Sequence, residues 1–172
     1  MNTKGIYMKE KNEVKFYNVL FPVWMIIWIP SLLWLLLIPA NYLIDHLVVW
    51  LSNRKMPGSG TFCKKHVWKI CLAGFAADFA GSFVLFIFAT CTDFKSLEAI
   101  SDGIFQNPFS NAGSFVFVLA AVCISAIIIY RMDKGILERA GLPVEEAKRT
   151  ARNLAVFTAP YLFFVPSELF WA

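Results

Sequence analysis

The hydrophobic positions of the chain are gathered into four long runs, at residues 16–51, 67–90, 113–130 and 154–171. The last three runs are each close to the ~20 residues that a helix needs to cross a bilayer. None of the runs alternates strictly between apolar and polar residues, as a strand of a membrane barrel does. The pattern therefore predicts an all-α, polytopic helical bundle. We expect one membrane domain over residues 1–172, with three clear spans and about four transmembrane helices.

The first run is too long for one straight crossing. A continuous helix over residues 16–51 would be about 54 Å long, against a hydrocarbon core of ~30 Å. Pro22, Pro30 and Pro39 supply break points, because proline removes a helix hydrogen bond. Two arrangements fit. Either residues 16–37 span the membrane and residues 41–51 form an interfacial helix, or residues 16–29 and 40–52 are the arms of a re-entrant hairpin.

Basic residues predict the orientation, because Lys and Arg are concentrated in cytoplasmic loops. The bases between the first two runs and at the start of the second are Arg54, Lys55, Lys64, Lys65 and Lys69. Only Lys95 lies between the second and third runs, whereas Arg131, Lys134, Arg139, Lys148, Arg149 and Arg152 lie between the third and fourth. We therefore expect a multi-pass protein of the cell membrane, with loops 52–66 and 131–152 in the cytoplasm and the C-terminus outside. The first group of five bases would also lie near anionic lipid headgroups.

Residues 131–152 have the pattern of a helical hairpin. Gly141 suits the end of one helix and Pro143 suits the first turn of the next. Glu145 and Glu146 near that start complement the helix dipole. We expect this hairpin to extend the third and fourth runs past the membrane. On the opposite side, residues 96–105 have the pattern of a short amphipathic helix.

Composition agrees with a membrane protein. Hydrophobic residues make up 58% of the 172 positions and charged residues only 16%, whereas about 25% is usual in soluble domains. This balance excludes a disordered chain. The net charge of +4 is small and scattered, so nucleic acid is not an expected partner. The four Cys and two His lack ligand spacing, so we expect neither a metal site nor a cofactor.

Ionisable groups inside a membrane are costly and typically functional, and Asp78 lies near the middle of the second run. Asn41 and Asp45 are four residues apart, which places both on one helical face. We expect these three residues to bind a cation or a proton. The structural alternative is that Asp78 ties helices together and that Asn41 and Asp45 face the headgroups. Three polar residues in or next to the fourth run could hydrogen-bond Asp78, namely Tyr161, Thr158 and Asn153.

The leading functional hypothesis is a small transport or permeation component, acting as a homo-oligomer or with a larger membrane protein. The alternative is a non-transporting accessory or immunity-type protein that binds another membrane protein. Motifs of metalloproteases, serine hydrolases and phosphate loops are missing from the sequence, so we do not expect an enzyme. A membrane hydrolase would need Asp78 and Asp45 on helices that touch, or a metal.

Overall fold

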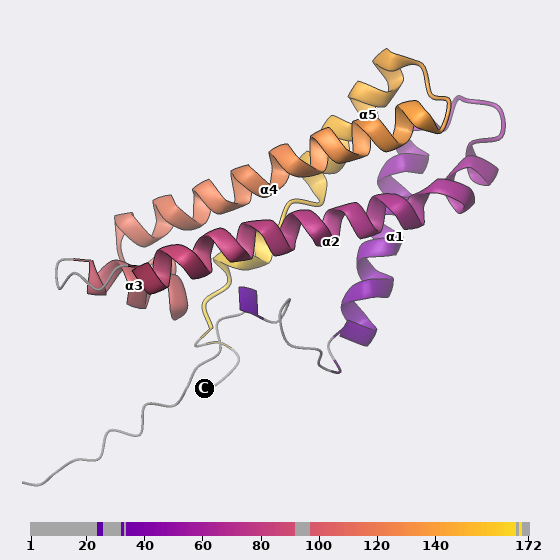
Figure 1. Ribbon diagram of the computed structural model, residues 1–172. Helices are drawn as coiled ribbons and strands as arrows, with labels where there is room; N and C mark the ends of the chain where they lie inside the picture. Colours follow the sequence, from indigo (N-terminus) through magenta and orange to yellow (C-terminus); the bar gives the residue numbers. More distant parts are fainter. Residues whose placement is uncertain (1–23, 26–31, 33, 92–96, 168, 170–172) are drawn as a thin grey trace, which may run out of the picture.

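The computed structural model describes residues 24–25, 32, 34–91, 97–167 and 169. Regular structure in this part of the chain is helical (Figure 1). The helices are α1 (Trp34–Asn53), α2 (Ser59–Cys91), α3 (Glu98–Phe105), α4 (Ala112–Arg139) and α5 (Val144–Phe157), followed by the 3-10 turn η2 (Tyr161–Phe164). The all-α prediction is therefore confirmed for the described residues.

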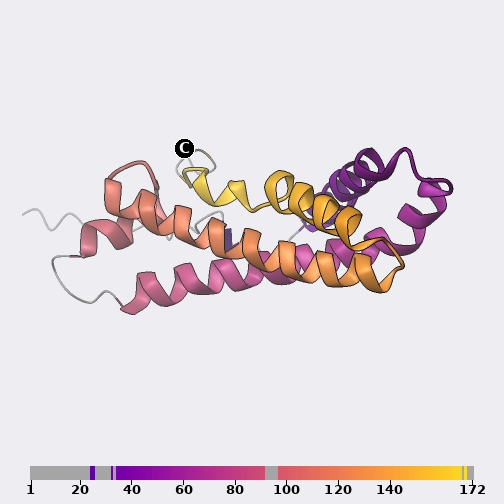
Figure 2. The same cartoon turned by 90° about the horizontal axis from the view of Figure 1, so that it is seen from above.

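The antiparallel pair of α2 and α4 forms the body of the molecule (Figure 2). The two helices come close together at Gly81, where an added Cβ would lie 2.0 Å from Ser125 Oγ and 3.2 Å from the Ala121 carbonyl oxygen. Beside this contact, the Ser125 hydroxyl donates a hydrogen bond of 3.1 Å to the Ala77 carbonyl. The contact fixes the register of the pair, because it places Ser125 level with Ala77.

Helix α1 crosses this pair at a wide angle (Figure 1). Its start is held by Trp34, whose ring stacks on Phe75 of α2 with centroids 6.1 Å apart. Its end is tied to α5, because the Asn53 amide donates to Thr150 Oγ1 at 3.1 Å. Arg149 and Asn153 donate to the carbonyl and the hydroxyl of Ser52. These hydrogen bonds join α1 and α5 at one end of the bundle.

The break expected at Pro39 is wrong, because α1 runs through this residue without interruption. Pro39 is the sixth residue of α1, so it removes only the hydrogen bond to the carbonyl of Leu35. Packing on both sides of Pro39 holds the helix together, through Trp34 before it and the buried Val48 and Val49 after it. Neither arrangement predicted for residues 16–51 has this helix. Pro22 and Pro30 lie outside the described residues.

The span predicted over residues 154–171 is also wrong. Helix α5 ends at Phe157 and the chain continues as a turn and the short η2. Pro160 and Pro166 explain the difference, because proline cannot donate a helix hydrogen bond and disfavours helix in the residue before it. The segment nevertheless returns along the bundle. Ser167 donates backbone and hydroxyl hydrogen bonds to the carbonyls of Gln106 and Phe105, beside α3.

The turn between α4 and α5 has the form that its sequence predicts. Gly141 adopts a φ of +95°, which glycine tolerates at a helix end. The amides of Gly141 and Leu142 donate to the carbonyls of Glu138 and Leu137, which is the Schellman pattern. The loop expected over residues 52–66 is shorter than predicted, since α2 begins at Ser59. Lys64, Lys65 and Lys69 therefore lie on the first turns of α2.

Three helices, α1, α2 and α4, are long and apolar enough to cross a membrane. Large apolar side chains stay exposed along them, such as Leu43 of α1, Phe83 of α2 and Ile127 of α4. Such exposed surfaces are consistent with a membrane protein. At about 50 Å and 42 Å, α2 and α4 exceed the ~30 Å hydrocarbon core, so both extend beyond it if they cross upright.

The contact at Gly81 predicts a paired effect of two glycine substitutions. Gly81→Ala forces Ser125 to turn away from Ala77 and should lower the free energy of unfolding by about 1–3 kcal/mol. Gly74→Ala, where an added Cβ meets nothing within 4 Å, should leave it unchanged or raise it by up to about 1 kcal/mol. Reversible unfolding in mixed micelles measures both changes. Equal effects of the two substitutions would contradict the close contact.

The predicted orientation can be tested with cysteines added at the two ends of the bundle, which should be labelled from opposite sides of the membrane. The α1–α2 turn and the α4–α5 turn lie together at one end, and α3 lies at the other (Figure 1). We expect Asp102→Cys to react with a membrane-impermeant maleimide on intact cells, and Lys55→Cys to react only after permeabilisation. The unmodified chain supplies the background from its own cysteines. Labelling of both added cysteines from one side would contradict the predicted orientation.

Candidate functional site

Three carboxylates are buried inside the described part of the bundle, one on each of the three long helices. The exposed fractions are 4% for Asp45 on α1, 8% for Asp78 on α2 and 1% for Asp133 on α4. Charged side chains are almost never so fully buried unless they are paired. The site therefore needs a physical explanation.

Each carboxylate is buried because it lies on the face that its helix turns to the core. On α1, Asp45 precedes the buried Val48 and Val49 by three and four residues. On α4, Asp133 lies four residues from Ile129 and from Leu137, both completely buried. Residues three or four apart share a helical face. The apolar packing that joins the helices thus carries the acids into the interior.

Asp45 occupies the middle of the group. Its side chain accepts a hydrogen bond from the Cys71 thiol of α2, and it interacts electrostatically with both Asp78 and Asp133. Asp78 and Asp133 lie farther from each other. With Ser125 level with Ala77, nine residues separate their levels, or about 13 Å along the bundle. The three acids therefore form a row, which we call the carboxylate row: Asp78, Asp45 and Asp133.

The carboxylate row lacks hydrogen bonds that its burial demands. In the described part of the chain, neither carboxylate oxygen of Asp133 has a partner, nor has Oδ1 of Asp78. The ion pairs found among these residues, Lys134 with Glu138 and Lys148 with Glu145, lie at the surface. An unsatisfied buried polar group costs about 1–3 kcal/mol. The row is therefore a poor device for stabilising the fold.

The structure brings together two of the three residues that the sequence singles out, Asp78 and Asp45. Asn41 shares the face of Asp45 and is half-buried. The three expected supporting residues hydrogen-bond other groups, so they do not join the row. Thr158 and Tyr161 donate to the carbonyls of Leu154 and Val156, and Asn153 donates to Ser52.

The sequence pattern does not single out Asp133 and Cys71, although both belong to the group around Asp45. Asp133 falls within the basic segment 131–152, where an acid reads as one more loop charge. The available signal is its spacing, because Asp133 continues the apolar stripe from Ile129 to Leu137. Cys71 is seven residues before Asp78 and hence on the same face of α2. Its role depends on the position of α1, which the pattern of α2 does not contain.

Two other chemistries fit the row less well. Within the described ranges, no group of three or more His, Cys, Asp or Glu side chains is gathered closely enough to hold a metal ion. Helices α1 and α2 do touch, which is the condition for a membrane hydrolase with two carboxylates. However, the hydrogen-bond partner of Asp45 is Cys71, whereas two acids that share a proton lie about 3 Å apart.

Comparison with known proteins yields no relative. The chain matches no protein-family model, no curated protein and no solved structure.

The unpartnered oxygens of Asp133 predict a gain in stability when the charge is removed. Asp133→Asn keeps the shape of the side chain and removes the cost of a buried charge that lacks a partner, so it should raise the free energy of unfolding by about 1 kcal/mol. The control is Asp102→Asn on α3, an exposed position where we expect a change within about 0.5 kcal/mol. Reversible unfolding in mixed micelles measures both. A marked loss of stability in Asp133→Asn would mean that the carboxylate has a partner after all.

Proposed function

We propose that this protein is a small membrane transport component in which the carboxylate row binds and passes protons. The observation that carries the proposal is the row itself: three buried acids on three helices, held without a basic partner among the described residues. Intramembrane acids of this kind mark proton relays and ion pathways.

The spacing of the row favours protons over a bound metal cation. A calcium ion binds its oxygen ligands at about 2.3–2.6 Å, and the distance from magnesium to its oxygen ligands is shorter still. Acids that are spread over about 13 Å along the bundle cannot surround one such ion. A proton needs only one carboxylate at a time, so a spread row serves as successive binding positions. Asp45, which interacts with both other acids, would be the middle position.

Electrostatics gives the row a way to pass a proton. Neighbouring carboxylates in a low dielectric repel each other when both are charged, so a proton on one acid lowers the cost of charge on the next. The Cys71 thiol donates to Asp45 and so gives the middle acid a hydrogen-bond partner within the bundle. A proton arriving from Asp78 or Asp133 would neutralise Asp45 and weaken that hydrogen bond, because charge-assisted hydrogen bonds are the stronger ones.

We also propose that the working unit contains more than one copy of the chain. The interior between the helices is filled by buried apolar side chains, among them Val49, Val67, Ile129 and Leu154. Water that reaches the two ends of the carboxylate row would therefore enter more easily between copies of the chain than through the filled interior of one copy. A monomeric mass for the active reconstituted protein would contradict this part of the proposal.

The test of function is proton flux into liposomes that contain the purified protein and a trapped pH dye. A potassium diffusion potential, negative inside, drives proton entry. Acidification should be faster than in protein-free liposomes, and both Asp78→Asn and Asp45→Asn should reduce it to the protein-free rate. Asp102→Asn, which removes an exposed acid far from the row, should retain the wild-type rate.

Two results would overturn the proposal. One is wild-type protein that moves no protons, which would favour the accessory, partner-binding alternative. The other is Asp78→Asn protein that moves protons as fast as the wild type. Helical content measured by circular dichroism ensures that a loss of flux is not a loss of fold.

A further inference from the structure

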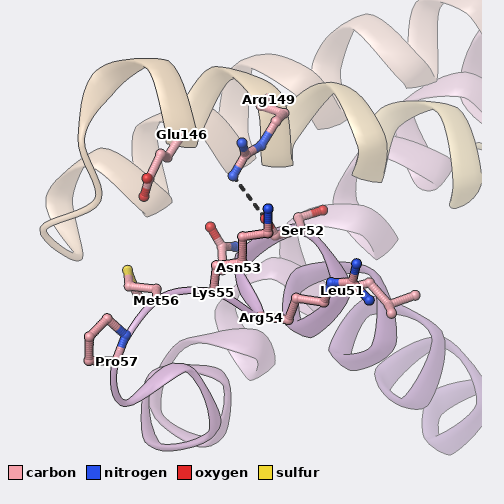
Figure 3. A pocket seen from close by; sticks show the side chains of 9 residues that line it. All are labelled: Leu51, Ser52, Asn53, Arg54, Lys55, Met56, Pro57, Glu146 and Arg149. Atoms are coloured by element: carbon pink, nitrogen blue, oxygen red, sulfur yellow. Dashed lines mark hydrogen bonds between the residues drawn. The ribbon is translucent and has the colours of Figure 1, made fainter.

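A hollow with a cationic lining lies at the end of the bundle where α1, α2 and α5 meet (Figure 3). Its volume is about 340 Å³, within the usual range of ligand pockets, about 300–1,000 Å³. The α1–α2 turn and the end of α1 form one side, and α5 forms the other. Figure 3 shows Arg149 reaching from α5 to Ser52 at the end of α1, and Glu146 pointing toward the side of the turn that contains Met56 and Pro57.

The charges of the lining favour an anion. Arg54, Lys55 and Arg149 contribute three positive charges and Glu146 one negative charge, a net of +2. Arg54 and Lys55 are exposed, so they can turn toward a ligand. Arg149 is held in place, because its Nη2 donates to the Ser52 carbonyl at 2.9 Å, and its remaining N–H groups can serve a second acceptor.

The surroundings of the hollow favour a lipid over a free anion. Leu51 of α1 is part of the lining and is 49% exposed. It ends a row of exposed leucines spaced four residues apart, with Leu47 at 52% and Leu43 at 67%. This spacing keeps the three side chains on one helical face. The hollow thus joins a cationic site to an apolar strip, which matches the two parts of an anionic phospholipid.

We propose that this hollow binds the phosphate headgroup of an anionic phospholipid, with Arg54, Lys55 and Arg149 as its ligands and the acyl chains along Leu43, Leu47 and Leu51. Clusters of Lys and Arg at the cytoplasmic end of membrane helices recognise anionic lipids in this way. The five bases expected to lie near lipid headgroups fall into two groups in the structure. Arg54 and Lys55 line the hollow, whereas Lys64, Lys65 and Lys69 lie outside it on α2.

The site is tested by native mass spectrometry of the full chain in non-ionic detergent, titrated with short-chain phosphatidylglycerol. Phosphatidylcholine is the zwitterionic comparison and should bind less. The double variant Arg54→Gln/Lys55→Gln should lose about 25-fold in affinity for phosphatidylglycerol, since each base near the surface contributes about fivefold. Lys64→Gln/Lys65→Gln removes the same charge from exposed positions outside the hollow and should change affinity less than about twofold.

A variant that is expected to increase lipid affinity separates an effect on binding from damage to the fold. Glu146→Gln raises the net charge of the lining from +2 to +3, as counted above, and should tighten binding about fivefold. An equal loss of affinity in Arg54→Gln/Lys55→Gln and in Lys64→Gln/Lys65→Gln would overturn the site. So would Glu146→Gln protein that binds the lipid no more tightly than the wild type. A lipid displaced by an equal concentration of inorganic phosphate would overturn its assignment to a phospholipid.

Discussion

The close contact between α2 and α4 at Gly81 is the constraint on which the rest of the structure depends. Only a residue without a Cβ allows Ser125 and the Ala121 carbonyl to come so near. The register set there places Asp133 near the level of Cys71 and leaves Asp78 farther along. It also places the α4–α5 turn beside the start of α2. In a membrane, close approach at small residues substitutes for the hydrophobic force that drives packing in water.

The same packing imposes the electrostatic cost of the carboxylate row. Its acids lie on the faces that join helices, so they cannot be turned to solvent without separating α1, α2 and α4. An apolar residue in their place would pack without an unsatisfied oxygen. The three buried carboxylates therefore lower the stability of the fold, as functional sites often do. Their spread along the bundle, with Asp45 between the others, suits a mobile proton better than a fixed ion.

Charge is distributed unequally over the molecule, and the two proposed sites reflect this. The acids of the row are enclosed by apolar side chains, whereas the bases gather at the end with the two turns, close to Arg149 and Lys55. A basic end is stable at a cytoplasmic membrane surface, where anionic lipids attract it. Binding a headgroup there would hold the joined ends of α1 and α5, and with them the helix that carries Asp45.

The sequence by itself determines the class of protein. Long apolar runs with few charges predict helices that are long and apolar enough to cross a membrane, and Gly141 with Pro143 predicts the α4–α5 turn, because these are local effects of composition and backbone geometry. Asp78 stands out because its neighbours in the chain are apolar. The early end of the helix in the last run is also local, because Pro160 and Pro166 outweigh its apolar content. The tertiary structure alone decides that α1 continues through Pro39, because packing on both sides of this residue outweighs the lost hydrogen bond. It also decides that Asp133 and Cys71 meet Asp45, because that meeting depends on how three helices pack and not on the pattern of any one of them.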